Sequence, residues 1–177
     1  MPSRGRGRVS LVVRRRASEA LRVAWGWAAS LCLGMTSALG MVNKKFGSSV
    51  QTAGWLVVVE PEYAADRSDP EGRRFVFVYR IQVTNISGVA ATLRRRRWLV
   101  VDAAGRRTEV EGEGVVGQQP RLAPGQTFNY SSFTPIETAW GTMEGSYQLE
   151  TDEGGVFEIA VGRFYLVAPT GRAAMPG

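Results

Sequence analysis

The run FVFVYRIQVT, residues 75–84, constrains the fold of this chain more than any other stretch, because its side chains alternate with a period of two. One face of the extended backbone carries only apolar or aromatic side chains, those of Phe75, Phe77, Tyr79, Ile81 and Val83. The opposite face mixes valine with polar residues. Because β-branched and aromatic residues also favour extended backbone, the run predicts a half-buried β-strand.

Further short segments have the same character, at residues 55–60, 96–102, 127–132, 145–151, 156–161 and 163–167. Turn-forming sequences separate the segments, namely NISG at 85–88, DAAG at 102–105, APGQ at 123–126 and DEGG at 152–155. No helical period occurs between them. The pattern predicts an all-β protein, an antiparallel β-sandwich of the immunoglobulin or fibronectin type III kind.

The first 50 residues differ in composition, with nine Lys and Arg residues and a single acid, Glu19. Residues 1–22 are rich in arginine and resemble a transit peptide for a mitochondrion or plastid. Residues 23–42 are uncharged and long enough to span a bilayer, or to form part of a secretory signal. We expect 1–50 to target the chain to an organelle or to anchor it in a membrane. The sandwich should follow at 51–168, with a flexible tail at 169–177.

The chain has one cysteine, Cys32, and no histidine. Zinc sites require several Cys or His ligands, and general bases and nucleophiles are most often His, Cys or an activated Ser. We therefore expect no catalytic residue, no metal, no cofactor and no enzymatic activity. A loosely held divalent cation at the carboxylates of Glu109, Glu111 and Glu113 is the alternative.

The densest charge of the predicted sandwich is the arginine run, Arg94, Arg95, Arg96 and Arg97. One interpretation is a basic patch for phosphate or an acidic partner. The other is neutralisation across a hairpin: if residues 102–105 form the loop, Arg96 faces Glu111 and Arg94 faces Glu113. We favour neutralisation. A nucleic-acid partner is not expected, because aromatic residues are not interleaved with the arginines.

The segment GEGVVGQQP, residues 112–120, contains the pattern G-x-G-x-x-G at Gly112, Gly114 and Gly117. In dinucleotide-binding folds this pattern opens a helix whose N-terminus holds a pyrophosphate. Here Pro120 and the prolyl-glycine that follows prevent such a helix. We expect the glycines to permit a turn or a bulged strand end. The alternative is a phosphate, pyrophosphate or nucleotide site at Gly112–Gly117 with Arg121, with or without a divalent cation.

Three motifs, RSDPE, GEGVVGQQP and APGQTFNY, occur in this order, and GTMEGSYQLETDEGGVFEIAVGRFYL follows them. Over residues 52–167 the chain closely resembles the ApaG domain family. The resemblance implies a fibronectin type III-like sandwich and a protein-interaction module without an agreed enzymatic activity. It also implies two weaker associations, pyrophosphate binding by the glycine motif and divalent-cation homeostasis.

The chain departs from the family pattern at two places. Arg96, Arg97 and Trp98 stand where the family usually has Arg-His-Trp, and FTPIETAWG replaces the usual Gly-Cys-Pro type of loop. We expect a non-enzymatic module that binds a protein through loops at one end of the sandwich, including 112–120 and 132–141. The candidate apolar anchors are Phe133, Ile136 and Trp140, for which core packing is the alternative.

Overall fold

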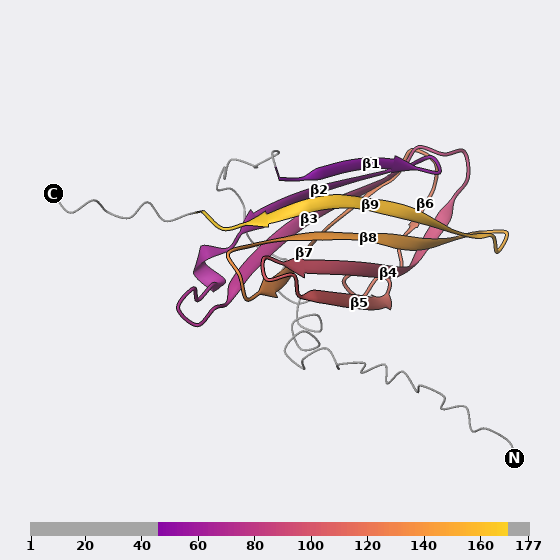
Figure 1. Ribbon diagram of the computed structural model, residues 1–177. Coiled ribbons are helices and arrows are strands. Elements are labelled where there is room, and N and C mark those ends of the chain that lie inside the picture. Colours follow the sequence, from indigo (N-terminus) through magenta and orange to yellow (C-terminus); the bar gives the residue numbers. More distant parts are fainter. Residues whose placement is uncertain (1–45, 170–177) are drawn as a thin grey trace, which may run out of the picture.

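The computed structural model describes residues 46–169, and these form nine strands and one short 3-10 helix (Figure 1). The elements are β1 (Ser48–Thr52), β2 (Trp55–Tyr63), η2 (Ala65–Arg67), β3 (Phe75–Asn85), β4 (Ala91–Asp102), β5 (Arg107–Glu113), β6 (Arg121–Leu122), β7 (Thr127–Ile136), β8 (Trp140–Thr151) and β9 (Val156–Val167).

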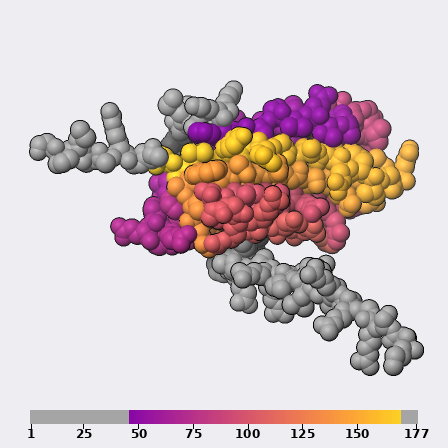
Figure 2. All heavy atoms as spheres, in the orientation of Figure 1, coloured from indigo at the N-terminus to yellow at the C-terminus, as the bar shows by residue number. Residues whose placement is uncertain are grey.

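The strands form two antiparallel sheets. The first sheet has the order β1-β2-β3-β7, and the second has the order β5-β4-β8-β9. The short strand β6 pairs with the first two residues of β4, Ala91 and Thr92. In Figure 1 the second sheet lies in front of the first, and in Figure 2 its outer face is turned toward the reader. The predicted all-β, fibronectin type III-like sandwich is confirmed.

The core lies between the two sheets and follows the predicted alternation. In β3 the side chains of Phe77, Tyr79, Ile81 and Val83 are all buried, whereas Arg80 between them is exposed. An aromatic group fills the centre of the core: the ring of Trp98 packs against those of Tyr79, Tyr147 and Phe164. Because these rings come from both sheets, they tie the two layers together.

Two features of the strands differ from the sequence prediction. The segments 156–161 and 163–167 are one continuous strand, β9, although Gly162 stands between them. That glycine serves close packing, because a Cβ there would lie 2.5 Å from Val50 on β1. Strand β1 itself was not expected, and it begins inside the range predicted for the N-terminal extension.

The predicted targeting segment, the uncharged stretch 23–42 and the tail beyond Pro169 lie outside the described residues. Within 46–169, no helix has both the length and the apolar character needed to cross a membrane.

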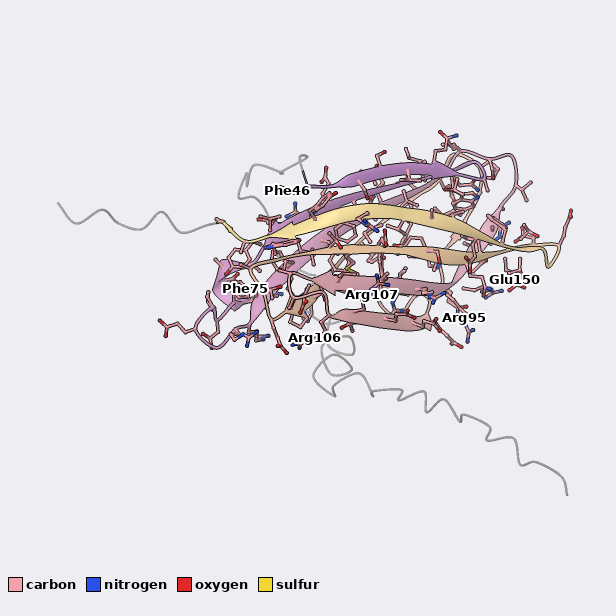
Figure 3. The ribbon with its side chains drawn as sticks, in the orientation of Figure 1. Phe46, Phe75, Arg95, Arg106, Arg107 and Glu150 are labelled. Carbon is pink, nitrogen blue, oxygen red and sulfur yellow. The ribbon has the colours of Figure 1, made fainter. Side chains whose placement is uncertain are left out.

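The antiparallel strands place the loops at two opposite ends. The loops 64–74, 103–106 and 137–139 lie at one end, and the loops 86–90, 114–126 and 152–155 lie at the other. Figure 3 shows the separation, with Arg106 toward the first end and Arg95 and Glu150 toward the second. The prediction that 112–120 and 132–141 share one binding end is therefore wrong, because β5 carries the chain from one end to the other and the glycine motif begins only near the end of that strand.

Candidate functional site

The β4–β5 hairpin turns on three residues, Ala103–Gly105, rather than on four. Gly105 adopts a φ of +78° and donates its N–H to the Asp102 carbonyl at 2.9 Å, which is the three-residue loop with glycine in the left-handed region. The expected register is therefore wrong by one residue, and a shift by one exchanges the two faces of a strand. Arg97 lies opposite Glu111, and Arg95 lies opposite Glu113.

The neutralisation predicted for the arginine run occurs with these different partners. Arg97 donates to Glu109 at 3.1 Å and lies 3.4 Å from Glu111, so that carboxylates hold its pKa above the ordinary value. Arg94 contacts Glu150 at 2.8 Å. Because Arg94 and Arg97 have acidic partners inside the molecule, the run offers less charge to an external anion than its sequence indicates.

Arg96 differs from its neighbours because its side chain turns toward the glycine motif. Its Nη1 donates to the backbone carbonyls of Glu113 at 2.9 Å and Gly114 at 2.7 Å. Gly112 lies opposite Arg96 in the register, and a Cβ on Gly112 would lie 2.9 Å from the guanidinium. Gly112 therefore lacks a side chain so that the Arg96 guanidinium can pack closely against its backbone, and it does not itself form the turn.

The rest of the motif is a tight turn. The N–H of Val115 donates to the Gln118 carbonyl and the N–H of Gln118 donates to the Val115 carbonyl, both at 2.8 Å. The two residues between them, Val116 and Gly117, have φ values of +43° and +78°. Gly114 also has a positive φ, +54°. Such turns require left-handed backbone, for which glycine is the favoured residue. The predicted structural role of Gly114 and Gly117 is confirmed.

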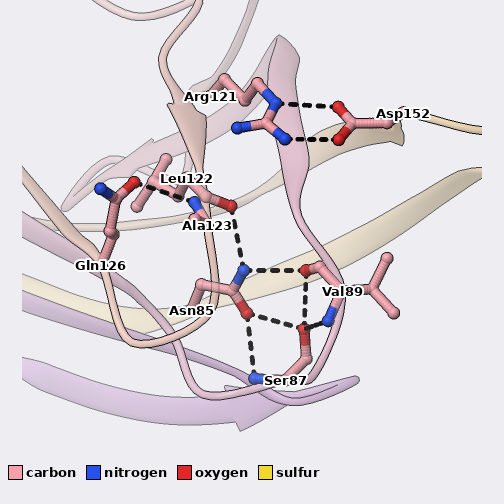
Figure 4. Close-up of polar contacts among 8 residues, drawn as sticks. All are labelled: Asn85, Ser87, Val89, Arg121, Leu122, Ala123, Gln126 and Asp152. Carbon is pink, nitrogen blue, oxygen red and sulfur yellow. Dashed lines mark hydrogen bonds and ion pairs between the residues drawn. The ribbon is translucent and has the colours of Figure 1, made fainter.

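Arg121, the cation of the alternative phosphate site, lies in β6 and contacts the β8–β9 turn (Figure 4). Its guanidinium makes a two-point contact with the Asp152 carboxylate, with 2.9 Å between Nε and Oδ1. This contact holds the pKa of Asp152 below its usual range. Both Arg96 and Arg121 thus have partners within the molecule, and the two side chains serve different loops.

A buried group of tyrosines lies in the sandwich near Arg96. The hydroxyls of Tyr130 and Tyr147 are hydrogen-bonded to each other, and Tyr79 packs in the same region. Burial raises the pKa of all three phenols above the ordinary value, and the positive charge of Arg96 acts in the opposite direction. The phenols therefore stay neutral at physiological pH, which suits packing and hydrogen bonding rather than acid–base chemistry.

The three predicted anchors do not come together. Ile136 is only 8% exposed and belongs to the core, so its interpretation as an exposed anchor is wrong. Phe133 is half-buried in β7, opposite Val78 on the outer face of the first sheet. Trp140 begins β8 in the second sheet and is 52% exposed.

Trp140 has apolar neighbours that the sequence analysis did not single out. Val167 lies directly opposite it on β9, and Tyr165, 48% exposed, pairs with Thr142 one step along the same face. Diagonal neighbours in an antiparallel pair are about 7–8 Å apart, within reach of aromatic side chains. We call Trp140, Tyr165 and Val167 the Trp140 face. The alternation in RFYLV, residues 163–167, was the signal that could have placed Tyr165 outward.

The Trp140 face is held in place by backbone contacts and bounded by charges. The Trp140 carbonyl accepts from the Thr138 hydroxyl at 2.7 Å and from the Ala103 N–H at 3.2 Å. On one side lies the ion pair of Arg106 and Glu137, at 2.7 Å. On the other, Arg163 contacts both carboxylate oxygens of Glu144 at 2.9 Å and lowers the pKa of that acid.

A groove of about 210 Å³ adjoins the Trp140 face. Tyr165 and Val167 form one side of it, and Phe46, Pro61 and Tyr63 contribute further apolar surface. The groove is also lined by Glu60, Glu62 and Arg80, so the Trp140 face adjoins, through Tyr165 and Val167, a groove of mixed apolar and charged character at the end of β2.

No group of three Asp, Glu, His or Cys side chains among residues 46–169 is arranged to hold a metal ion. Glu109 and Glu111 instead contact Arg97. The expected absence of a metal and a cofactor stays a prediction.

Replacing Arg96 with alanine should lower the free energy of unfolding by about 1.5–3 kcal/mol, because two carbonyls of the glycine loop lose a charged donor. The matched change Arg95→Ala, at an exposed position of the same strand, should stay within about 0.5 kcal/mol. Urea denaturation of the two variants measures both values. Equal, small effects would contradict the role assigned to Arg96.

Comparisons with known proteins relate this chain to one family. The family model described as the ApaG domain matches residues 65–151. Protein ApaG of Rhizobium etli is 51% identical over 113 residues, which cover 64% of this chain and 87% of that protein. Protein ApaG of Rhodopseudomonas palustris is 47% identical over 119 residues, which cover 67% of this chain and 92% of that protein.

Solved structures have the same fold. A protein described as ApaA from Bordetella pertussis is 42% identical, with a TM-score of 0.63, over 65% of this chain and 94% of that one. A structural-genomics target is 30% identical, with a TM-score of 0.64, over 72% of this chain and 96% of that one.

The relatives also correct the predicted location. The ApaG proteins that match are bacterial, so they give no support to a transit peptide for a mitochondrion or plastid. The segment expected as the alternative membrane anchor, 23–42, lies outside the residues that the structure describes. The names of the relatives include no enzyme designation.

Proposed function

The chain belongs to the ApaG domain family, and from this membership we propose that it is a non-enzymatic protein-interaction module that binds a partner through the Trp140 face. One observation carries the proposal. The side chains of Trp140 and Tyr165 are both about half exposed, and together with Val167 they lie on one face of the second sheet. The ion pairs Arg106–Glu137 and Arg163–Glu144 lie on the two sides of this group. Tryptophan and tyrosine are the residues most enriched at the energetic centres of protein interfaces.

The surroundings of the Trp140 face have the anatomy of a protein-binding surface. Apolar side chains occupy its centre, and the charged pairs Arg106–Glu137 and Arg163–Glu144 lie at its margin. The backbone contacts that hold Trp140 reduce the ordering that binding would require. The adjoining groove between Tyr165 and Tyr63 could accept a side chain of the partner.

Non-enzymatic action is part of the proposal for a chemical reason. The described residues contain no histidine and no cysteine, and the buried tyrosines stay neutral. The pyrophosphate alternative receives less support, because the guanidinium groups of Arg96 and Arg121 already contact groups of the protein.

Replacing Trp140 with alanine should abolish partner capture while the fold is retained. The test uses the tagged full-length chain, purified from cells that naturally produce it, with bound proteins quantified by mass spectrometry. Proteins recovered with the natural chain should fall at least about tenfold with Trp140→Ala, the typical consequence of losing a central aromatic anchor. Tyr165→Ala should also lower the recovered amounts of the same proteins.

The matched control is Val156→Ala, which alters an exposed apolar side chain on the same sheet at the opposite end. It should leave capture unchanged. The proposal is overturned if Trp140→Ala and Tyr165→Ala recover the same proteins in the same amounts as the control.

A further inference from the structure

The first sheet ends in a strand whose outer edge has no partner among residues 46–169. Strand β7 pairs with β3 and with no other described strand. The alternation of hydrogen bonds shows which groups point outward. Asn85 donates to the Gln126 carbonyl at 2.9 Å, so odd residues of β3 bond to even residues of β7. The N–H and C=O groups of Asn129, Ser131 and Phe133 therefore point to the free edge.

This edge also lacks the usual protection. The ten residues of β7, TFNYSSFTPI, include no charged side chain. Natural proteins protect a long edge strand with charges, bulges or a covering segment, because its open backbone groups recruit other strands. The only protective residue is Pro135, whose nitrogen points to the free edge near the end of the strand.

The other sheet edges within the described residues are protected. Strand β5 carries Arg107, Glu109, Glu111 and Glu113 on its seven positions. Strands β1 and β9 pack against each other: the Ser48 hydroxyl donates to the Gly162 carbonyl at 2.8 Å. The uncharged, unpaired edge is thus a particular property of β7.

A hollow runs along the same edge. A groove of about 700 Å³ is lined by consecutive residues of β7 from both faces of the strand, Phe128, Asn129, Tyr130 and Ser131, and by Val116 and Gln118 of the glycine turn. Strands β2 and β3 supply the rest of its lining, Val58, Glu60, Arg80, Ile81 and Gln82. Because side chains from both faces of β7 line it, the groove extends around the edge. The turn that Arg96 holds in place forms its opposite wall.

We propose that the free edge of β7 binds an extended, uncharged segment of a partner protein, which adds to the first sheet as a further antiparallel or parallel strand. Main-chain bonds to Asn129, Ser131 and Phe133 supply affinity, and alternate side chains supply specificity. Those facing inward meet Val116, Phe128 and Tyr130, so they are apolar. Those facing outward lie beside Asn129 and Ser131, with Arg80 opposite Ser131 on β3.

The charges and the backbone favour this occupant over others. A charged strand finds no counter-charge on β7, whereas a neutral strand matches it. The two charged residues of the groove, Glu60 and Arg80, have opposite signs and lie opposite each other on β2 and β3, so together they favour neither an acidic nor a basic segment. Two copies of β7 paired around Ser131 would place Pro135, which has no N–H, opposite Thr127, so a ladder bond would be lost. The inference does not depend on the Trp140 face, which belongs to the other sheet.

The test starts from a phage-displayed library of random nine-residue peptides, selected on the immobilised full-length chain. An enriched peptide is then added to the labelled chain, and amide hydrogen exchange is followed by NMR. Exchange at Asn129, Ser131 and Phe133 should slow by about tenfold or more, because these amides gain partners. Exchange at Phe128, Tyr130 and Ser132, whose amides already bond to β3, should not change.

Two variants separate backbone from side-chain recognition. Ser131→Pro removes the outward N–H and should weaken peptide binding about tenfold, the equivalent of one hydrogen bond. Ser131→Ala keeps the N–H and should bind normally, and Trp140→Ala should also bind normally. The inference is overturned by a library without enriched peptides or by slowed exchange without alternation. The same alternating protection in concentrated chain without peptide would overturn it too, since the occupant would then be a second copy.

Discussion

Replacing Trp98 with alanine should lower the free energy of unfolding by about 3–5 kcal/mol, the range for removing a large buried aromatic side chain. Trp98 is 1% exposed. Its ring lies 5.9 Å from the centres of the Tyr79 and Tyr147 rings and 6.2 Å from that of Phe164. These residues come from both sheets, so the cavity would weaken the contact between the layers. Urea denaturation followed by far-ultraviolet circular dichroism measures the loss.

The matched control for Trp98 is the other tryptophan of the second sheet. Trp140→Ala removes the same side chain from a position that is 52% exposed, and should change the free energy of unfolding by less than about 0.5 kcal/mol. A large loss of stability with Trp140→Ala would place that residue in the structural core and would contradict its assignment as a recognition residue.

Replacing Gly114 with alanine should lower the free energy of unfolding by about 2–5 kcal/mol. The left-handed backbone, with a φ of +54°, accounts for about 1–2 kcal/mol of this cost. The added Cβ would lie 2.1 Å from the Gln118 carbonyl oxygen, so the turn must also shift, at a cost of about 1–3 kcal/mol. The stability of the purified variant against urea gives the value.

The control is Gly117→Ala in the same turn. Gly117 has a φ of +78°, but a Cβ there would have no atom within 4 Å. Only the backbone cost of about 1–2 kcal/mol should remain. If both variants lose the same stability, the close approach of Gly114 to Gln118 does not matter to the fold.

The sandwich could be predicted from the sequence because alternation at period two is a local signal. The side chains of β3 alternate between core and exterior as the run 75–84 indicates. The hairpin register could not be predicted with the same accuracy, since it depends on whether Gly105 adopts a left-handed conformation. That choice changed the residue opposite Glu111 from Arg96 to Arg97.

The candidate site was harder to predict because it depends on pairing between strands. Trp140 was identified from sequence, whereas Tyr165 and Val167 join it only through the β8–β9 register. Ile136 was misjudged because residues at the end of an alternating strand give no local sign of what covers them. The role of Arg96 was also hidden, since the one-residue shift places it opposite Gly112 rather than Glu111.

The claim that the glycine loop is structural and does not bind phosphate is tested most directly by an amide NMR titration. Pyrophosphate and ATP are added to the full-length chain, each with and without magnesium. We expect no saturable shift at Gly112, Gly114, Gly117 or Arg121 at millimolar ligand, since Arg96 and Asp152 already contact these elements. Saturable shifts that cluster on those four residues would contradict this expectation and would identify a phosphate-binding loop.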